Sequence, residues 1–148
     1  MTQQDIRWLE QFSKYRKILA QLYCSITSLI QQNDFPEDID DLLQDGLRHR
    51  LKLTQEMSWK VMKEYVESQG YLMIKGPRTA ICKAFEIGII DDIYWEQMVI
   101  GDNSYLTEDN INISNMCNAI LEYHYPLFSR FEKTMLSLSS DSKPNGIA

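Results

Sequence analysis

One stretch of the sequence carries charged and aromatic side chains whose types and spacing suit a phosphate-bearing ligand. It covers residues 48–63 and contains Arg48, His49, Arg50, Lys52, Glu56, Trp59, Lys60 and Lys63. Residues four apart, such as Lys52 and Glu56 or Glu56 and Lys60, are neighbours on a helix surface. The stretch could therefore hold a ligand phosphate, or its residues could form solvated ion pairs beside a core tryptophan.

Further positive charge comes from Lys75, Arg78 and Lys83, near the predicted start of another helix. The N-terminus of a helix attracts anions, because its first backbone N–H groups are unbonded and its dipole is positive there. A phosphate between this helix and residues 48–63 is one interpretation of the pattern.

Other residues of catalytic or metal-binding type lack the partners that such chemistry requires. Neither His49 nor His124 has a helical metal-ligand partner, so we expect an exposed His49 and a partly buried, hydrogen-bonded His124. Asp38 and Asp40 have the D-x-D spacing of nucleotidyl-transfer enzymes, but these also need an upstream Gly-Ser loop, and the first glycine is Gly46. No Walker loop, G-x-S-x-G or G-x-G-x-x-G motif occurs. The sequence predicts no catalytic residue, metal ligand or cofactor in this chain.

The composition of the 148 residues is that of one ordinary globular domain, with 44% hydrophobic and 24% charged residues. A net charge of −6 argues against general nucleic-acid binding, which requires a basic surface. The chain has no secretory leader and no apolar run of about 18 residues, so we expect a cytoplasmic protein without a membrane span. Cys24, Cys82 and Cys117 are widely spaced, which predicts reduced thiols packed as small hydrophobic residues.

Apolar spacing predicts an all-α, up-down helical bundle of three long helices and two short ones. Apolar residues recur every three or four positions from residue 5 to about 33, after a cap at Asp38 as far as Gly70, and after a cap at Thr107 to about 138. Short helices are expected at 77–87 and 91–100. The first two long helices should lie antiparallel, because a short loop joins them.

Three segments need a separate prediction. Residues 71–74 could form a strand, but a lone strand has no partner, so we expect a loop there. Pro126 should kink the last long helix, since it lacks a backbone donor and clashes with the preceding turn. The polar residues from Ser139 onward predict disorder. The expected organisation is a helical domain at 1–138 and a disordered tail at 139–148.

Several ordered motifs resemble the nucleotidyltransferase substrate-binding protein family. Residues 46–65 are similar to its run Q-R-F-E-F-T-x-E-x-x-W-K followed by K-x-Y, with matches at Arg50, Thr54, Glu56, Trp59, Lys60, Lys63 and Tyr65. Residues 76–78 resemble its S-P-R, residues 84–91 its A-F-x-x-G-L-I-D with Trp95 following, and residues 125–128 its L-P-L-F. The resemblance covers roughly residues 5–138.

This resemblance implies a bundle of the HEPN superfamily, similar to the C-terminal domain of kanamycin nucleotidyltransferase. Relatives bind a separate minimal nucleotidyltransferase, which supplies the catalytic half with its Mg²⁺ and nucleoside triphosphate. Many such pairs are toxin–antitoxin systems in which the helical member is a ribonuclease. The family resemblance also suggests Arg50, Glu56, Trp59, Lys60 and Arg78 as substrate- or nucleotide-binding residues.

The ribonuclease of such relatives uses an Arg and a His in a run like R-N-x-x-S-H-x-Y, where the Arg stabilises phosphate charge and the His moves a proton. The corresponding residues here are 101–107, with Asp102 in place of the Arg, Asn103 retained and no His. A carboxylate has the wrong charge to face a phosphate, which predicts that the ribonuclease activity is lost. Tyr105 is a candidate modification site, as a remnant of the H-x-Y tyrosine.

Three hypotheses follow. The first is a non-catalytic substrate-binding subunit that pairs with a minimal nucleotidyltransferase. The second is a ribonuclease toxin that uses an unrecognised site, and the third is a purely structural helical oligomer. A homodimer is compatible with all three, because kinked long helices often leave an apolar face to pair.

Overall fold

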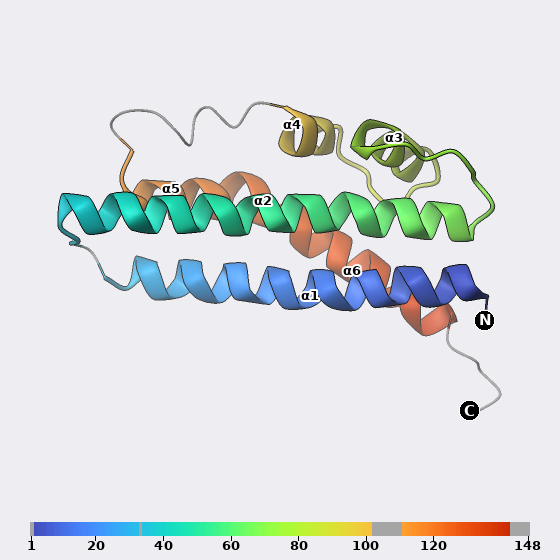
Figure 1. Ribbon diagram of the computed structural model, residues 1–148, viewed down its shortest axis with the longest axis horizontal. Helices are drawn as coiled ribbons and strands as arrows, with labels where there is room; N and C mark the ends of the chain where they lie inside the picture. Colours follow the sequence, from blue (N-terminus) through green and yellow to red (C-terminus); the bar gives the residue numbers. More distant parts are fainter. Residues whose placement is uncertain (1, 33, 102–110, 143–148) are drawn as a thin grey trace.

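The computed structural model describes residues 2–32, 34–101 and 111–142 (Figure 1). This part of the chain forms three long helices and two short ones, joined by segments without regular structure. The all-α prediction is therefore confirmed. No helix in the described ranges is long and apolar enough to cross a membrane.

Helix α1 (Gln3–Ile30) begins with a capping box that the apolar pattern did not predict. The backbone N–H of Asp5 donates to Thr2 Oγ1 at 3.1 Å, and the backbone N–H of Thr2 donates to Asp5 Oδ2 at 3.0 Å. Each bond satisfies a backbone donor that the helix itself leaves unbonded. The helix therefore starts two residues before Asp5, and it ends three residues before the predicted boundary near residue 33.

Helix α2 (Glu37–Ser68) lies alongside α1 and antiparallel to it (Figure 1). Its N-cap is Pro36, so the prediction that Asp38 caps the helix is wrong. Pro36 has no side-chain bond to the helix, and acidic residues in the first turn instead interact favourably with the helix dipole. Near the N-terminus of α1 and the C-terminus of α2, the rings of Trp8 and Tyr65 make an edge-to-face contact with their centroids 5.0 Å apart.

Two short helices, α3 (Pro77–Glu86) and α4 (Tyr94–Ile100), pack over the C-terminal half of α2 (Figure 1). Residues 71–75 have no regular structure, as predicted. Gly88 ends α3 with φ +86°, a conformation that residues with a Cβ rarely adopt. Helix α4 begins three residues later than the predicted start at residue 91, because the Asp92 carboxylate accepts the backbone N–H of Tyr94 at 2.9 Å and holds a turn there.

The last long helix consists of α5 (Ile113–Ala119), a π-helical segment η2 (Ile120–His124) and α6 (Tyr125–Ser142). The predicted cap at Thr107 is wrong: Asn112 is the N-cap and accepts the backbone N–H of Asn115 at 2.8 Å. Thr107 itself lies outside the described residues. The wide π turn ends two residues before Pro126, and α6 runs obliquely to α5 as predicted for a kink (Figure 1).

Helix α6 continues to Ser142, beyond the expected boundary at 138. Ser139 is buried and its hydroxyl donates to the carbonyl of Leu136 at 2.7 Å, so the first serines of the expected tail are helical. A serine hydroxyl bonded to a carbonyl of the preceding turn is compatible with a helix, which composition alone does not reveal. Residues 143–148 lie outside the described ranges.

The core lies where α1, α2 and the α5–α6 helix meet. Its largest fully buried members include Trp8, Tyr15, Met62, Phe128 and Phe131. Trp95 of α4 reaches the same core through edge-to-face contacts with Phe128 and Phe131, at centroid distances of 5.9 and 5.5 Å. Because α4 is anchored in this way, its position over α2 is fixed.

Candidate functional site

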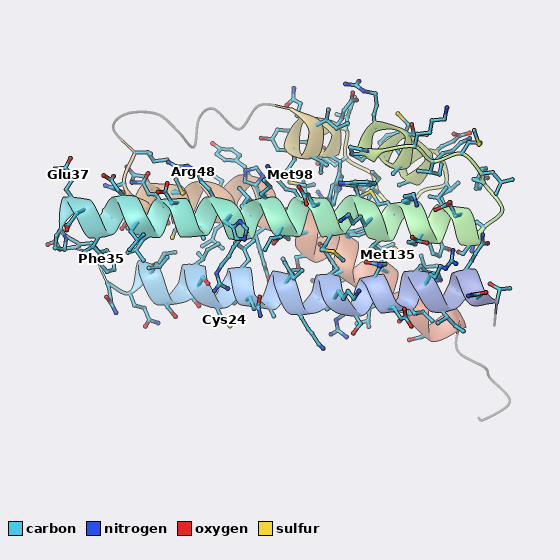
Figure 2. All side chains as sticks on the ribbon, viewed as in Figure 1. Cys24, Phe35, Glu37, Arg48, Met98 and Met135 are labelled. Atoms are coloured by element: carbon cyan, nitrogen blue, oxygen red, sulfur yellow. The ribbon has the colours of Figure 1, made fainter. Side chains whose placement is uncertain are left out.

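A groove of about 650 Å³ runs along the face of α2 that is turned away from α1, and we call it the α2 groove. Most of its lining comes from α2, with Pro77 at the start of α3 and Val99 and Gly101 at the end of α4 completing the wall. The polar and aromatic side chains that line it are Arg48, Lys52, Gln55, Glu56, Trp59 and Lys60. Arg48 projects from this side of the helix in Figure 2.

Helix geometry explains why these side chains share one face. Positions 48, 52, 55, 56, 59 and 60 follow steps of three and four residues, close to the 3.6 residues of one turn. The predicted residues Glu56, Trp59 and Lys60 are thus brought together by α2 alone. Arg48 and Lys52, two further cations of the charged stretch at residues 48–63, join them.

The charges of the groove are mostly positive, with three cationic side chains, Arg48, Lys52 and Lys60, and one carboxylate, Glu56. Arg48 donates to Asp45 at 2.9 Å and to the Gln44 side chain at 3.1 Å. Within the described residues, Lys52, Glu56 and Lys60 form no ion pair within 4.0 Å. The solvated ion pairs considered for these three residues do not form here, and both lysines remain available to an anion.

Trp59 is neither a fully buried core residue nor an exposed one. Its ring packs against the core on one side and lines the α2 groove on the other. The other two tryptophans, Trp8 and Trp95, are buried. A half-buried aromatic ring beside cationic groups offers a flat surface on which a planar or cationic ligand group can stack.

Gln55 was not predicted to belong to the site. Its side chain lines the α2 groove although the residue is only 5% exposed. Its Nε2 is buried and has no hydrogen-bond partner among the residues the structure describes. A buried amide without a partner costs about 1–3 kcal/mol, so such groups are rare and need an explanation.

Arg50 lies on the opposite side of α2 from the groove. Each residue turns a helix by about 100°, so Arg50 projects about 200° away from Arg48. It is exposed and lines a separate hollow of about 460 Å³ between α1 and α2, together with Cys24, Ser28 and Gly46. The structure therefore does not bring Arg50 together with Lys60.

Arg78 is exposed on α3 and pairs with Glu96 of α4 at 2.7 Å. It does not line the α2 groove, which α3 reaches only at Pro77. The ion pair joins the two short helices, so a ligand phosphate would compete with a carboxylate for this guanidinium. Tyr105, Asp102 and Asn103 lie outside the described residues, and their predicted roles stay predictions.

The two histidines and the D-x-D pair were the other candidates for catalytic or metal-binding residues. His49 is exposed as predicted, whereas His124 is fully buried, and burial lowers its pKa to about 4. Asp40 of the D-x-D pair is half-buried and accepts the backbone N–H of Ile113. In the described ranges, no three His, Cys, Asp or Glu side chains are grouped closely enough to hold a metal ion.

The cysteines differ from one another. Cys117 is buried, and burial raises the pKa of its thiol to about 11. Cys24 and Cys82 are exposed free thiols, so the prediction that all three are packed in the interior is wrong for these two.

A family model described as "nucleotidyltransferase substrate binding protein like" matches residues 10–137 of the chain. The chain belongs to this family. None of the curated proteins compared with the chain matches it. The matched region of this nucleotidyltransferase substrate-binding-like protein includes all of α2, and hence every side chain of the groove that α2 supplies.

For this nucleotidyltransferase substrate-binding-like protein, the family motif and the groove overlap only in part. Glu56, Trp59 and Lys60 belong to both, while Arg50 and Arg78 belong to the motif alone. The helical spacing of Arg48, Lys52 and Gln55 relative to Trp59 was a signal in the sequence that could have placed them in the site. The burial of Gln55 was not visible in the sequence, because it depends on how the helices pack.

Proposed function

We propose that this protein is a non-catalytic substrate-binding subunit that acts with a separate minimal nucleotidyltransferase. The observation that carries the proposal is the α2 groove, where Lys52 and Lys60 flank Glu56 beside the half-buried ring of Trp59. Family membership supports the same role, since the family is described by substrate binding for a nucleotidyltransferase. The partner would supply the catalytic carboxylates, Mg²⁺ and the nucleoside triphosphate, and the groove would hold a substrate of the transfer.

The chemistry of the groove suits binding better than bond cleavage. Lysine ammonium groups attract phosphate as point charges, and an aromatic ring orients a flat substrate group. Asp102 stands at the position of the ribonuclease arginine, and a carboxylate repels the phosphate that an arginine would stabilise. This substitution also supports binding rather than RNA cleavage. We therefore propose a two-component system of the toxin–antitoxin type in which the ribonuclease motif has degenerated.

The test is co-expression with the minimal nucleotidyltransferase encoded nearby, followed by co-purification and a nucleotidyl-transfer assay. We expect a stable complex, and we expect Lys52→Ala and Lys60→Ala to lower the transfer rate of the complex without dissociating it. Lys17→Ala, on the exposed face of α1, is the matched control and should leave the rate unchanged.

Two outcomes would contradict the proposal. If neither Lys52→Ala nor Lys60→Ala changes the transfer rate of the complex, the α2 groove does not bind a substrate of the transfer. Cleavage of RNA by the purified chain without its partner would replace the binding role with an enzymatic one. The mass of the purified chain, measured with and without the transferase, tests in the same preparation whether the chain forms a homodimer.

A further inference from the structure

Helix α2 carries a second apolar line on its surface, apart from the residues that it buries in the core. Ile39, Leu42 and Leu53 are 40%, 65% and 38% exposed, and Gly46 lies between them. Residues 39, 46 and 53 are seven apart, which is nearly two full turns, so they fall on almost the same line of the helix. Leu42 is one turn from Gly46 on the same side. We call these four residues the outer stripe, and a grouped set of exposed apolar side chains is typical of an interaction surface.

Gly46 is an unusual residue for the interior of a long helix. A glycine destabilises a helix relative to alanine, because it loses more backbone freedom on folding. A Cβ added at Gly46 would meet no atom within 4 Å in the described part of the chain, and the backbone here is ordinary helix. Packing within the described residues therefore does not require a glycine at this position. Close approach by the backbone of another helix would require one.

The outer stripe is symmetric about Gly46. If two copies of α2 cross antiparallel at this glycine, Ile39 of one copy faces Leu53 of the other, because both are seven residues from the crossing point. The two glycines then meet at the two-fold axis, as a dimer with the same surface on both subunits requires. Leu42 of one copy faces residue 50 of the other, at the edge of the hollow of about 460 Å³ between α1 and α2.

The charges of α2 are also arranged so that two antiparallel copies attract each other. Before Gly46 the charged residues are all acidic, and in the six residues after it they are all basic, as Glu37, Asp38, Asp40, Asp41 and Asp45 are followed by Arg48, His49, Arg50 and Lys52. An antiparallel crossing at Gly46 places the acidic part of one helix beside the basic part of the other. Such complementarity favours a second copy of this chain as the occupant of the outer stripe.

Arg50 has a place in this arrangement that the α2 groove does not give it. Arg48 pairs with Asp45 of its own chain, whereas Arg50 forms no ion pair within 4.0 Å among the described residues. Its position, one turn after Gly46, puts it opposite the acidic first turns of the second helix. The guanidinium that the family motif contains and the groove lacks is thus available to a partner chain.

We propose that the outer stripe is the interface of a symmetric dimer, in which α2 of two copies of this chain cross antiparallel at Gly46. Arg50 of each copy faces the carboxylates of Asp38 and Asp45 in the other. This inference goes beyond the proposed function, because none of the four stripe residues lines the α2 groove and the transferase takes no part in the contact.

The first experiment measures the mass of the full-length chain by analytical ultracentrifugation over a range of concentrations, without the transferase. We expect twice the mass of one chain, falling to one chain on dilution. Leu42→Glu should raise the dissociation constant about tenfold or more, because it sets a carboxylate in an apolar contact. Leu72→Glu is the matched control, since Leu72 is 73% exposed outside the stripe, and it should leave the dissociation constant unchanged.

The second experiment tests the crossing point itself. Two helices packed about 8–10 Å apart bring facing Cα atoms within reach of a disulfide. Gly46→Cys, made in a Cys24→Ser background, should therefore form an intermolecular disulfide on mild oxidation. The background protein, which keeps the exposed thiol of Cys82, is the control and should stay a single chain on a non-reducing gel.

Gly46→Leu separates the role of the glycine in the dimer from its role in the fold. Its side chain meets nothing in its own chain, so the variant should melt no lower than the wild type. At the crossing point it holds the two helices apart, so we expect the mass of one chain at concentrations where the wild type is a dimer.

The inference is overturned if the wild type has the mass of one chain at every concentration, or if Leu42→Glu and Gly46→Leu dimerise as tightly as the wild type. It is equally overturned if Gly46→Cys forms no more disulfide than its background protein. A chain that is monomeric alone, and that loses the transferase on Leu42→Glu, would assign the stripe to the transferase instead. These results leave the groove lysines untouched, so the proposed subunit role stands or fails separately.

Discussion

Both carboxylate oxygens of Asp40, in the first turns of α2, lie 3.1 Å from the backbone nitrogen of Ile113, the first residue of α5. The side chain of Gln44, one turn further along α2, donates to the carbonyl of Ile111 at 3.0 Å. Two helices that are distant in the sequence are therefore joined at their N-terminal ends by side-chain-to-backbone bonds. This arrangement also aligns the start of the last long helix with α2, the helix that carries the groove.

Replacement of Asp40 by alanine should destabilise the protein. The variant leaves the N–H of Ile113 without its acceptor and removes a negative charge from the positive end of the α5 dipole. We expect the free energy of unfolding to fall by about 1–2 kcal/mol, measured by urea denaturation. Asp41→Ala, at an exposed neighbouring position, is the control, and an equal loss in both variants would show that the cap contributes nothing.

Tyr15→Phe should also lower stability, because it removes the only atom that differs between the two residues. The Tyr15 hydroxyl is buried and donates to the carbonyl of Phe128 at 2.8 Å, which joins α1 to α6. We expect a loss of about 1 kcal/mol in the free energy of unfolding. Tyr23→Phe, which keeps the exposed ring stacked on Tyr125, should leave the urea midpoint unchanged.

Stability should decline as the pH falls below about 6.5, because His124 is buried in the neutral form. Burial lowers its pKa from 6.5 to about 4, so between these values the unfolded chain binds a proton that the folded chain does not. The contribution of neutral His124 is full above pH 6.5 and falls by about 3 kcal/mol once the pH is below 4.

Urea denaturation of wild type, His124→Gln and His49→Gln between pH 7.5 and 4.5 isolates this contribution from that of the carboxyl groups. The His124 variant should have a flatter dependence of stability on pH than the wild type. The His49 variant, altered at an exposed position, should follow the wild type. Parallel curves for all three proteins would exclude His124 as the source of the acid sensitivity.

The three thiols should react with a disulfide reagent at two different rates. Cys24 and Cys82 are exposed, whereas Cys117 is buried with its pKa raised to about 11, so at pH 8 it remains a shielded, protonated thiol. Because the thiolate is the reactive form, we expect two thiols to react rapidly in the native protein and the third only after unfolding. Rapid reaction of three thiols under native conditions would contradict the burial of Cys117.

The sequence by itself determined the helical class, the long apolar stripes and the kink at Pro126, because these depend on spacing along the chain and on the missing proline donor. It also determined that Glu56, Trp59 and Lys60 share a helix face, since helix geometry relates nearby residues directly. Family resemblance, in contrast, grouped Arg50 and Arg78 with them without regard to the direction in which each side chain projects.

Only the tertiary structure decided which face of α2 is a groove. That face is enclosed because Trp95 anchors α4 in the core and places Val99 and Gly101 opposite the helix. The Gln55 amide is also buried, and the contact between α2 and α5 brings the Asp40 carboxylate to the backbone N–H of Ile113 at the start of α5. Burial and long-range capping depend on which segments meet in space, and neither leaves a periodic signal in the sequence.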